Sequence, residues 1–191
     1  MDKTNKIRIK DITYLAIGIA LFVVLSMCLR VPVFENYYLC LGYVVMTVYI
    51  WNFKWYEGTI IGVLGVILYS WIGGLGVNGL PGWATGNLVI GLILGMTLPL
   101  FKKLADKVVK SEELAKKKAI IVPLFIVVAI IATFIGIELV KSFVDMFVVS
   151  QPFAVRFIKN FNSFIADAFV IVASVPVCLA LEKPAKLRYT K

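Results

Sequence analysis

The stretch Ala119–Val140, AIIVPLFIVVAIIATFIGIELV, decides the fold class of this chain. Its only charged residue is Glu138, near its end, and about 20 mostly apolar residues suffice for a helix to cross a bilayer. The composition agrees, because 61% of the 191 residues are hydrophobic and only 16% are charged. A soluble domain is about 25% charged. We therefore expect an integral membrane protein with no room for a sizeable soluble domain.

Five other apolar runs are long enough to be counted with this one, although the second is short and rich in aromatic residues. We predict an all-α fold with six transmembrane helices, forming a single substrate-binding domain over residues 1–191. A glycine-rich loop at 73–82, a lysine-rich segment at 102–118 and a polar stretch at 141–160 separate the later helices. The six predicted helices are Ile12–Leu29, Leu39–Asn52, Tyr56–Ile72, Trp83–Phe101, Ala119–Val140 and Phe161–Leu181.

The lysines and arginines orient these helices. With a cytoplasmic N-terminus, sixteen of the 20 cations fall on the cytoplasmic side, and only Arg30, Lys141, Arg156 and Lys159 fall outside. Short cytoplasmic loops carry an excess of Lys and Arg. Both termini are thus expected in the cytoplasm. The net charge of +9 needs no nucleic-acid partner, and the segment 102–118 is either solvated or in contact with anionic lipid or a partner.

Several kinds of chemistry are excluded by residue types that the chain lacks. It has no histidine, so Ser/His and Cys/His pairs, HExxH zinc sites and histidine-ligated haem are ruled out. Its three cysteines, Cys28, Cys40 and Cys178, have no CxxC spacing and suggest inert packing rather than a metal site or a disulfide framework. We expect no metal and no cofactor in this chain.

Polar side chains inside the predicted helices gather toward the external leaflet. Asn87, Glu138 and Asp167 come from three different helices, and intramembrane polar groups tend to mark function. One interpretation is a cavity open to the outside that holds a small polar ligand. The alternative is structural, with Glu138 and Lys141 as an interfacial pair, Asp167 bonded to a neighbouring helix and the asparagines as caps. The candidate substrate-binding residues are Tyr37, Tyr38, Asn78, Trp83, Asn87, Glu138, Lys141, Asn162 and Asp167.

Two short motifs give weaker signals. Ala16-Ile-Gly-Ile-Ala20 in the first helix has small residues four apart, a spacing that lets two helix backbones approach closely. The run Gly82-Trp-Ala-Thr-Gly-Asn-Leu-Val-Ile-Gly91 at the start of the fourth helix has three glycines, Gly82, Gly86 and Gly91, on either side of Asn87.

Together these features resemble the substrate-binding S component of the energy-coupling factor (ECF) importers of vitamins. That resemblance implies an importer subunit, not an enzyme, in the bacterial plasma membrane. Ala16 and Ala20 match the motif that docks on the transmembrane T component, and the run from Gly82 to Gly91 is similar to riboflavin-type members. Two partner ATPases would use the ATP, and the ligand site would lie on the external side. The missing N-terminal histidine argues against metal uptake, and the vitamin stays open.

Two other classes remain as alternatives. A self-sufficient small transporter or channel would need a hydrophilic path through both leaflets, and the inner leaflet has few ionisable groups. An integral membrane enzyme could use Asp167 and Glu138 as an acid/base pair, but no paired motif supports it.

Overall fold

The computed structural model describes residues 9–28, 31–34, 37–73, 80–109 and 114–186, and is almost entirely helical. A short antiparallel pair of strands, in which Val31 pairs with Leu39, follows the first helix. The elements in chain order are α1 (Ile9–Cys28), β1 (Val31–Phe34), β2 (Tyr37–Leu39), α2 (Gly42–Asn52), α3 (Trp55–Ile72), α4 (Leu80–Val108), α5 (Leu114–Thr133), the π-helix η1 (Phe134–Lys141), α6 (Ser142–Val148), α7 (Phe153–Ala173) and α8 (Val175–Lys186).

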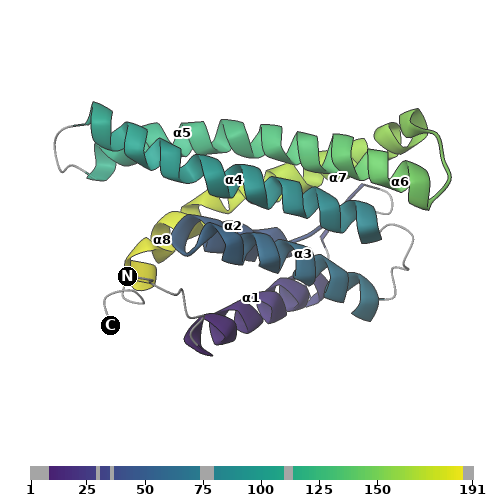
Figure 1. Cartoon of the computed structure of the whole chain (residues 1–191), viewed down its shortest axis with the longest axis horizontal. Helices are drawn as coiled ribbons and strands as arrows, with labels where there is room; N and C mark the ends of the chain where they lie inside the picture. The colour runs from purple at the N-terminus through teal and green to yellow at the C-terminus, as the bar shows by residue number, and fades with distance from the viewer. Residues whose placement is uncertain (1–8, 29–30, 35–36, 74–79, 110–113, 187–191) are drawn as a thin grey trace, which may run out of the picture.

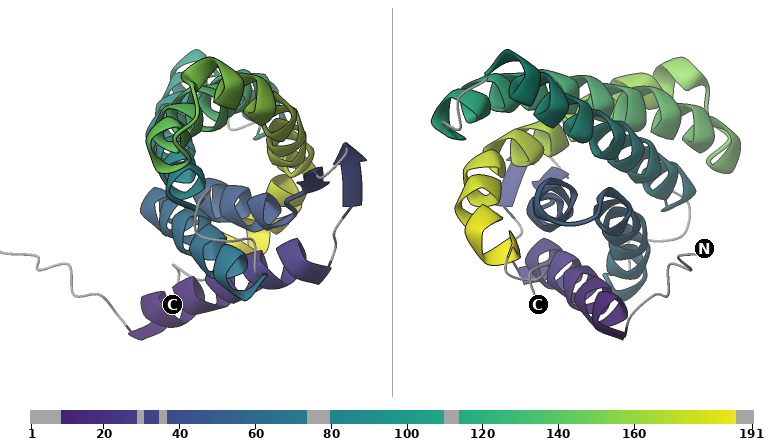
Figure 2. Two further views of the ribbon diagram at one scale, coloured as in Figure 1. Left: turned by 90° about the vertical axis from the view of Figure 1, so that its right-hand side faces the viewer. Right: turned by 60° about the vertical axis from the view of Figure 1, so that its left-hand side comes forward.

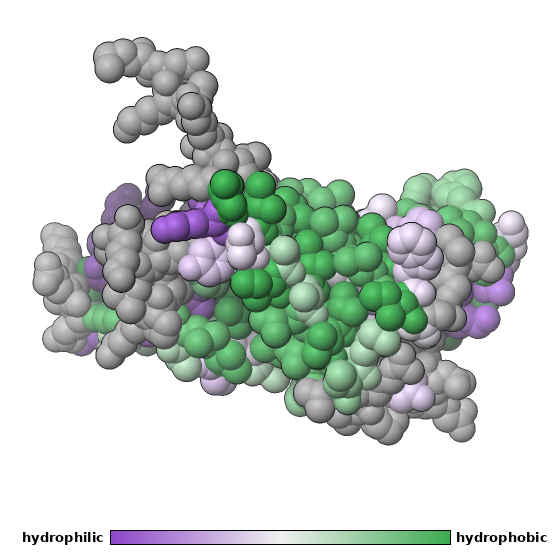
Figure 3. Space-filling model, turned by 90° about the horizontal axis from the view of Figure 1, so that it is seen from below, coloured by the Kyte–Doolittle hydropathy of each residue, from purple (hydrophilic) through white to green (hydrophobic). Residues whose placement is uncertain are grey.

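Five helical stretches are long and apolar enough to cross a membrane. They are α1, α3, α4, the continuous stretch Leu114–Val148 formed by α5, η1 and α6, and Phe153–Glu182 formed by α7 and α8. On the face shown in Figure 3, hydrophobic residues form a broad band between the two ends, and hydrophilic residues gather toward the ends. This distribution matches a protein that lies across a bilayer.

The helix ends divide between two ends of the bundle (Figure 1). At one end, α1 starts, α4 stops, α5 starts and α8 stops. At the other end, α3 stops, α4 starts and the turn between α6 and α7 lies. We call these the α4–α5 end and the α6–α7 end.

The short second helix departs from the six-span prediction. With 11 residues, α2 is about 16 Å long, whereas the hydrocarbon core of a bilayer is about 30 Å thick. Nearly all its residues are buried, among them Tyr43, Met46 and Trp51. It lies among α1, α3 and α8 in Figure 2. A helix enclosed by protein need not match the bilayer thickness, so α2 forms the core of the bundle rather than a span facing lipid.

Glycines let the helices around α2 approach it closely. A Cβ on Gly58 would lie 2.8 Å from the Met46 carbonyl oxygen, and one on Gly62 would lie 2.5 Å from the Met46 sulfur. A Cβ on Gly65 would lie 2.5 Å from the Phe22 ring. The glycines of α3 therefore serve packing, since small residues permit close helix contacts in membranes.

Several boundaries differ from the sequence-based prediction. The fourth helix runs to Val108 rather than Phe101, and the fifth starts at Leu114 rather than Ala119, so both helices extend into the lysine-rich segment 102–118. The segment after α1 contains the strand pair, because its β-branched and aromatic residues suit strands. The polar stretch 141–160 is mostly helical, with only 149–152 between α6 and α7. The last long helix starts at Phe153 rather than Phe161 and breaks at Ser174 before α8. Lys141, Asp145 and Arg156 pair with one another inside the protein, so these charges do not end the helices.

Candidate functional site

The Tyr43 hydroxyl is the centre of one buried polar group. It donates a hydrogen bond to Asn87 Oδ1 at 2.7 Å and accepts one from Trp83 Nε1 at 2.8 Å. Asn87 Nδ2 in turn donates to the Gly62 carbonyl oxygen at 2.9 Å. These bonds join α2, α3 and α4. The Asn87 amide therefore has protein partners at both of its ends.

Asp167 of α7 joins this group from a fourth helix. Its carboxyl group lies beside the Tyr43 hydroxyl and interacts electrostatically with Lys141. The Asp167 side chain is nearly completely buried. A carboxylate can accept about four hydrogen bonds. The Asp167 carboxyl group, beside Tyr43 and distant from Lys141, can therefore accept further ones. The Tyr43 group thus gathers hydrogen-bonding atoms from four helices.

A second polar group surrounds Asp145 of α6. Asp145 Oδ2 lies 2.5 Å from Arg156 Nη2 and 3.6 Å from Lys141 Nζ. Asn160 accepts a hydrogen bond from Lys141 and donates one to the Ser142 hydroxyl at 2.9 Å. Asp145, Ser142 and Asn160 are all buried. The Asp145 group thus holds one carboxylate between two cations at the α6–α7 end.

Glu138 lies between the two groups along the chain but is bonded to neither. The side chain is fully buried, and neither carboxylate oxygen has a hydrogen-bond partner among the described residues. Lys141, three residues on, bonds Asn160 and Asp145 instead. Glu138 and Lys141 therefore interact electrostatically but form no hydrogen bond, in contrast to the interfacial pair of the structural interpretation. A buried carboxylate without a donor is costly.

The helix geometry around Glu138 is unusual. Residues 134–141 form a π-helix, a type of turn that is frequently found at functional sites. Two glycines bring this turn against α4: a Cβ on Gly86 would lie 2.7 Å from the Gly136 carbonyl oxygen, and one on Gly136 would lie 2.6 Å from the Gly86 carbonyl oxygen. The backbones therefore touch two residues before Glu138.

Buried polar atoms without partners concentrate in the same region. In the described part of the chain, they are both carboxylate oxygens of Glu138, Asp145 Oδ1, Gln151 Oε1 and Arg156 Nε. All belong to the segment from Glu138 to Arg156. Native proteins rarely leave such atoms unsatisfied, so a group of them calls for a bound molecule or water. Cys, Asp and Glu side chains among the described residues form no group of three or more that could hold a metal ion.

The structure brings some of the predicted site residues together and leaves others apart. Trp83, Asn87 and Asp167 meet at Tyr43, and Lys141 joins the Asp145 group. Tyr38 is half exposed on β2, and Asn162 is half-buried on α7, outside the two groups formed by described residues. The side chain of Tyr37 and the whole of Asn78 lie outside the described residues.

The earlier start of its helix changes the position of Asp167 along it. With a helix starting at Phe161, Asp167 would lie about 9 Å from the helix start, but the helix begins at Phe153, so Asp167 lies about 21 Å along it. Asp167 nevertheless reaches the level of Asn87, because both contact the Tyr43 hydroxyl.

Three residues of these polar groups, Tyr43, Asp145 and Arg156, were not among the predicted substrate-binding residues. A tyrosine in an apolar run is typical of a membrane interface, so Tyr43 carried no signal of its own. Asp145 follows Lys141 by four residues, a spacing that places opposite charges on one helix face. That spacing was the available signal.

The residues of the small-xxx-small motif lie on the outside of α1. Ala16 and Ala20 are both exposed, as are Ile17, Leu21 and Val24. Gly18, between the two alanines, faces inward, where a Cβ would lie 2.3 Å from Ile61 Cδ1. The outer surface of α1 is therefore apolar and has small side chains near its middle.

The chain is similar in sequence to a known protein family. Residues 6–183 match the family described as ECF-type riboflavin transporter, S component. The UPF0397 proteins of Streptococcus agalactiae serotypes Ia and V are each 31% identical to the chain over 169 residues, covering 87% of this chain and 86% of theirs. No solved structure matches the chain.

Proposed function

The chain belongs to the ECF-type riboflavin transporter S component family, and from this premise we propose that it captures a vitamin-like ligand at the α6–α7 end. In this proposal it is a multi-pass protein of the bacterial plasma membrane. A T component and two ATPases deliver the ligand, and the ATPases use the ATP. The chain itself needs no cofactor and catalyses no reaction.

The buried carboxylate of Glu138 is the observation that carries the ligand site. Both its oxygens lack a hydrogen-bond partner among the described residues. A ligand with an N–H or O–H group would supply the missing donor, and hydrogen bonds to charged groups are among the stronger ones. Asp167, Tyr43 and Trp83 would form the opposite wall, with Asn87 holding Tyr43 in place.

Binding by the purified protein tests this site directly. We would first use native mass spectrometry to search for a co-purified ligand, then titrate a panel of B vitamins in detergent. The best ligand is then titrated against Glu138→Gln, Asp167→Asn and Asn87→Ala. Each variant should bind about five- to hundredfold more weakly, because a ligand group or the Tyr43 hydroxyl loses its partner.

The control for these variants is Asp106→Asn at the α4–α5 end. Asp106 is mostly exposed, so its neutralisation should leave vitamin binding unchanged. If all three site variants stay folded and bind as tightly as the parent, the polar groups are structural and the ligand site lies elsewhere.

The orientation of the site is a separate proposal. The cation distribution favours a cytoplasmic α4–α5 end, which contains the start of α1 and the end of α8. Single cysteines at Ser111 and Ser150, in a Cys28→Ser background that removes the exposed native thiol, distinguish the two sides. A membrane-impermeant maleimide added to intact cells should label Ser150→Cys and not Ser111→Cys. The reverse labelling would invert the topology.

The outer face of α1 is proposed to dock on the T component. Ala16 and Ala20 are exposed between larger apolar residues, so a bulky side chain there would prevent close helix contact. Ala16→Trp and Ala20→Trp should reduce co-purification with the T component and reduce uptake, while vitamin binding by the isolated chain is unchanged. Met96→Trp, on the exposed face of α4, is the control. If Ala16→Trp and Ala20→Trp both assemble with the T component as the parent does, the spacing of the two alanines has no role in docking.

A self-sufficient transporter is the competing function. Proteoliposomes that contain only this chain distinguish the two, because an S component should bind its ligand there without accumulating it. Uptake by the chain alone would favour the competing function.

A further inference from the structure

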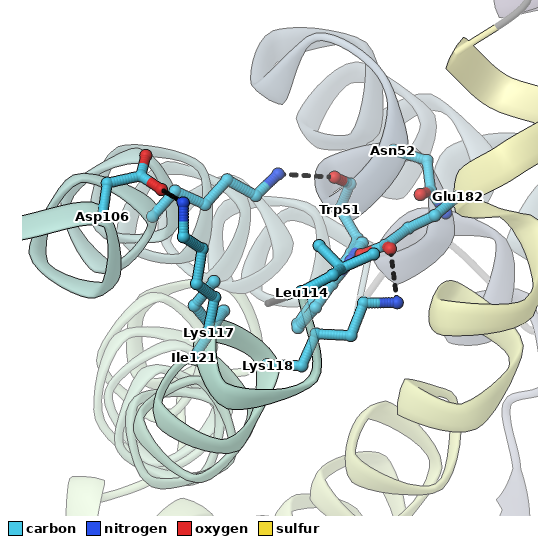
Figure 4. A pocket seen from close by; sticks show the side chains of 9 residues that line it. Trp51, Asn52, Asp106, Leu114, Lys117, Lys118, Ile121 and Glu182 are labelled. Atoms are coloured by element: carbon cyan, nitrogen blue, oxygen red, sulfur yellow. Dashed lines mark hydrogen bonds and ion pairs between the residues drawn. The ribbon is translucent and has the colours of Figure 1, made fainter. Parts of the chain in front are cut away.

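A cavity of about 260 Å³ opens at the α4–α5 end, far from the site described above. It lies where the ends of α2 and α4, the start of α5 and the middle of α8 meet (Figure 4). Its polar lining comes chiefly from Trp51, Lys102, Asp106, Lys117, Lys118 and Glu182.

The charged groups around the cavity are arranged in pairs. Lys118 Nζ lies 2.6 Å from Glu182 Oε2, whose other oxygen accepts a hydrogen bond from Trp51 Nε1 at 2.8 Å. Lys102 Nζ donates to the Trp51 carbonyl oxygen at 3.1 Å. Lys117 Nζ lies 2.7 Å from Asp106 Oδ1. The ammonium groups are thus held in place by neighbours that line the same cavity.

The cavity is lined by three lysines, Lys102, Lys117 and Lys118, and by two carboxylates, Asp106 and Glu182. The side chain of Asp106 is 63% exposed, so water competes for its bond with Lys117, and such surface pairs are weak. An incoming anion can therefore replace Asp106 as the partner of the Lys117 ammonium group with little loss of free energy.

The start of α5 adds to the positive potential. Leu114, the first residue of α5, lines the cavity, and the helix continues from it for 20 residues. The free N–H groups and the dipole at a helix N-terminus favour negatively charged groups. Leu114 and Ile121 also give the cavity an apolar wall beside its lysines.

We propose that this cavity binds a phosphate group, supplied by the headgroup of an anionic phospholipid or by a free phosphate compound. Three ammonium groups and a helix N-terminus surround a space large enough for a phosphate. Basic pockets between membrane helices on the cytoplasmic side are typical of anionic lipid sites. The site is independent of the vitamin site, so each can fail without the other.

The test compares lipids on the purified full-length chain in detergent. Melting temperature is followed as phosphatidylglycerol or phosphatidylcholine is added, and native mass spectrometry counts bound lipid. Inorganic phosphate, against chloride at equal ionic strength, forms a separate arm. Stabilisation by phosphatidylglycerol alone assigns the phosphate to a lipid, and stabilisation by inorganic phosphate as well assigns it to a free compound.

The variant Lys102→Gln/Lys118→Gln removes two ammonium groups but keeps donors for Trp51 and Glu182. It should bind the phosphate-bearing probe about tenfold more weakly, because two charge-assisted contacts are lost. The control Lys103→Gln/Lys107→Gln removes the same charge from exposed lysines of α4 outside the cavity. It should bind like the parent, and vitamin binding should be unchanged in both variants.

Two results would overturn the proposal. One is a parent protein that responds to neither phosphatidylglycerol nor inorganic phosphate. The other is an equal loss of affinity in the cavity variant and the control, which would indicate general attraction of a basic protein to anions.

Discussion

At the α6–α7 end the Asp145 carboxylate is completely buried between Arg156 and Lys141, whereas at the α4–α5 end the Asp106 carboxylate is mostly exposed beside Lys117. The first end also contains all the buried polar atoms that lack partners among the described residues. At the second end, the charged groups lining the cavity have neighbours of opposite charge or a carbonyl oxygen.

This difference separates two uses of charge. Buried groups have lost their water, so every missing partner costs free energy that only a bound molecule or rigid packing can offset. Exposed pairs gain little and lose little, so they can exchange partners. The α6–α7 end is therefore suited to selecting a ligand, and the α4–α5 end to attracting anions.

The largest expected effect comes from breaking the buried ion pair. Asp145→Ala leaves Arg156 and Lys141 buried without their carboxylate and should lower the free energy of unfolding by about 3 to 5 kcal/mol. Asp106→Ala should lower it by less than about 1 kcal/mol. Denaturant unfolding in detergent measures both, and equal losses would remove the distinction between the ends.

The next effect tests the backbone contact that supports the π-helix. A Cβ on Gly86 would lie 2.7 Å from the Gly136 carbonyl oxygen, so Gly86→Ala should lower the free energy of unfolding by about 1 to 3 kcal/mol. Gly136→Ala, on the other side of the contact, should act in the same direction. Alanine is the better helix former by about 1 kcal/mol, so a rise in melting temperature would mean that the helices separate at little cost.

A smaller effect, of opposite sign, is expected at Glu138. Glu138→Gln replaces a buried carboxyl group that has no donor among the described residues, so it should raise the ligand-free free energy of unfolding by about 1 kcal/mol while weakening ligand binding. Glu182→Gln is the matched change at the other end and should lower stability, because Lys118 and Trp51 bind this carboxylate. Destabilisation by Glu138→Gln would reveal a protein partner for the carboxylate. Melting curves without ligand decide this.

The smallest effect concerns the Lys117–Asp106 pair. A double-mutant cycle should give a coupling free energy of about 0.2 to 1 kcal/mol, because one partner is mostly exposed. The coupling should shrink as salt is raised from 0.05 to about 1 M, where the Debye length falls to about 3 Å. A coupling above about 2 kcal/mol that survives high salt would place this pair in the same class as Asp145 and Arg156.

Prediction from the sequence succeeded where the signal was local. The first and third predicted helices agree with α1 and α3 to within about three residues, which is the usual uncertainty of helix ends. The prediction failed at 141–160, where a polar stretch was expected to separate two helices. Asp145 and Arg156 pair across α6 and α7, and the spacing of Lys141 and Asp145 does not reveal that second pairing.

The candidate site was partly predictable for the same reason. Asn87, Glu138 and Asp167 stand out because polar side chains in apolar runs are rare. Tyr43 does not stand out, although it joins Asn87, Trp83 and Asp167. Its role depends on Trp83 and Asn87 of α4, which lie 40 and 44 positions away in the chain, and on Asp167 of α7.

The sequence by itself determined that the chain is a membrane protein, where most of its helices lie and which segments carry its cations. These properties are sums over neighbouring residues, and the hydrophobic effect scales with apolar area regardless of the final packing. Only the tertiary structure decided that α2 is enclosed, that Asp145 is paired and that Glu138 has no hydrogen-bond partner among the residues that the structure describes. Hydrogen bonds act over about 3 Å, so which buried groups are satisfied depends on how separate helices place their atoms.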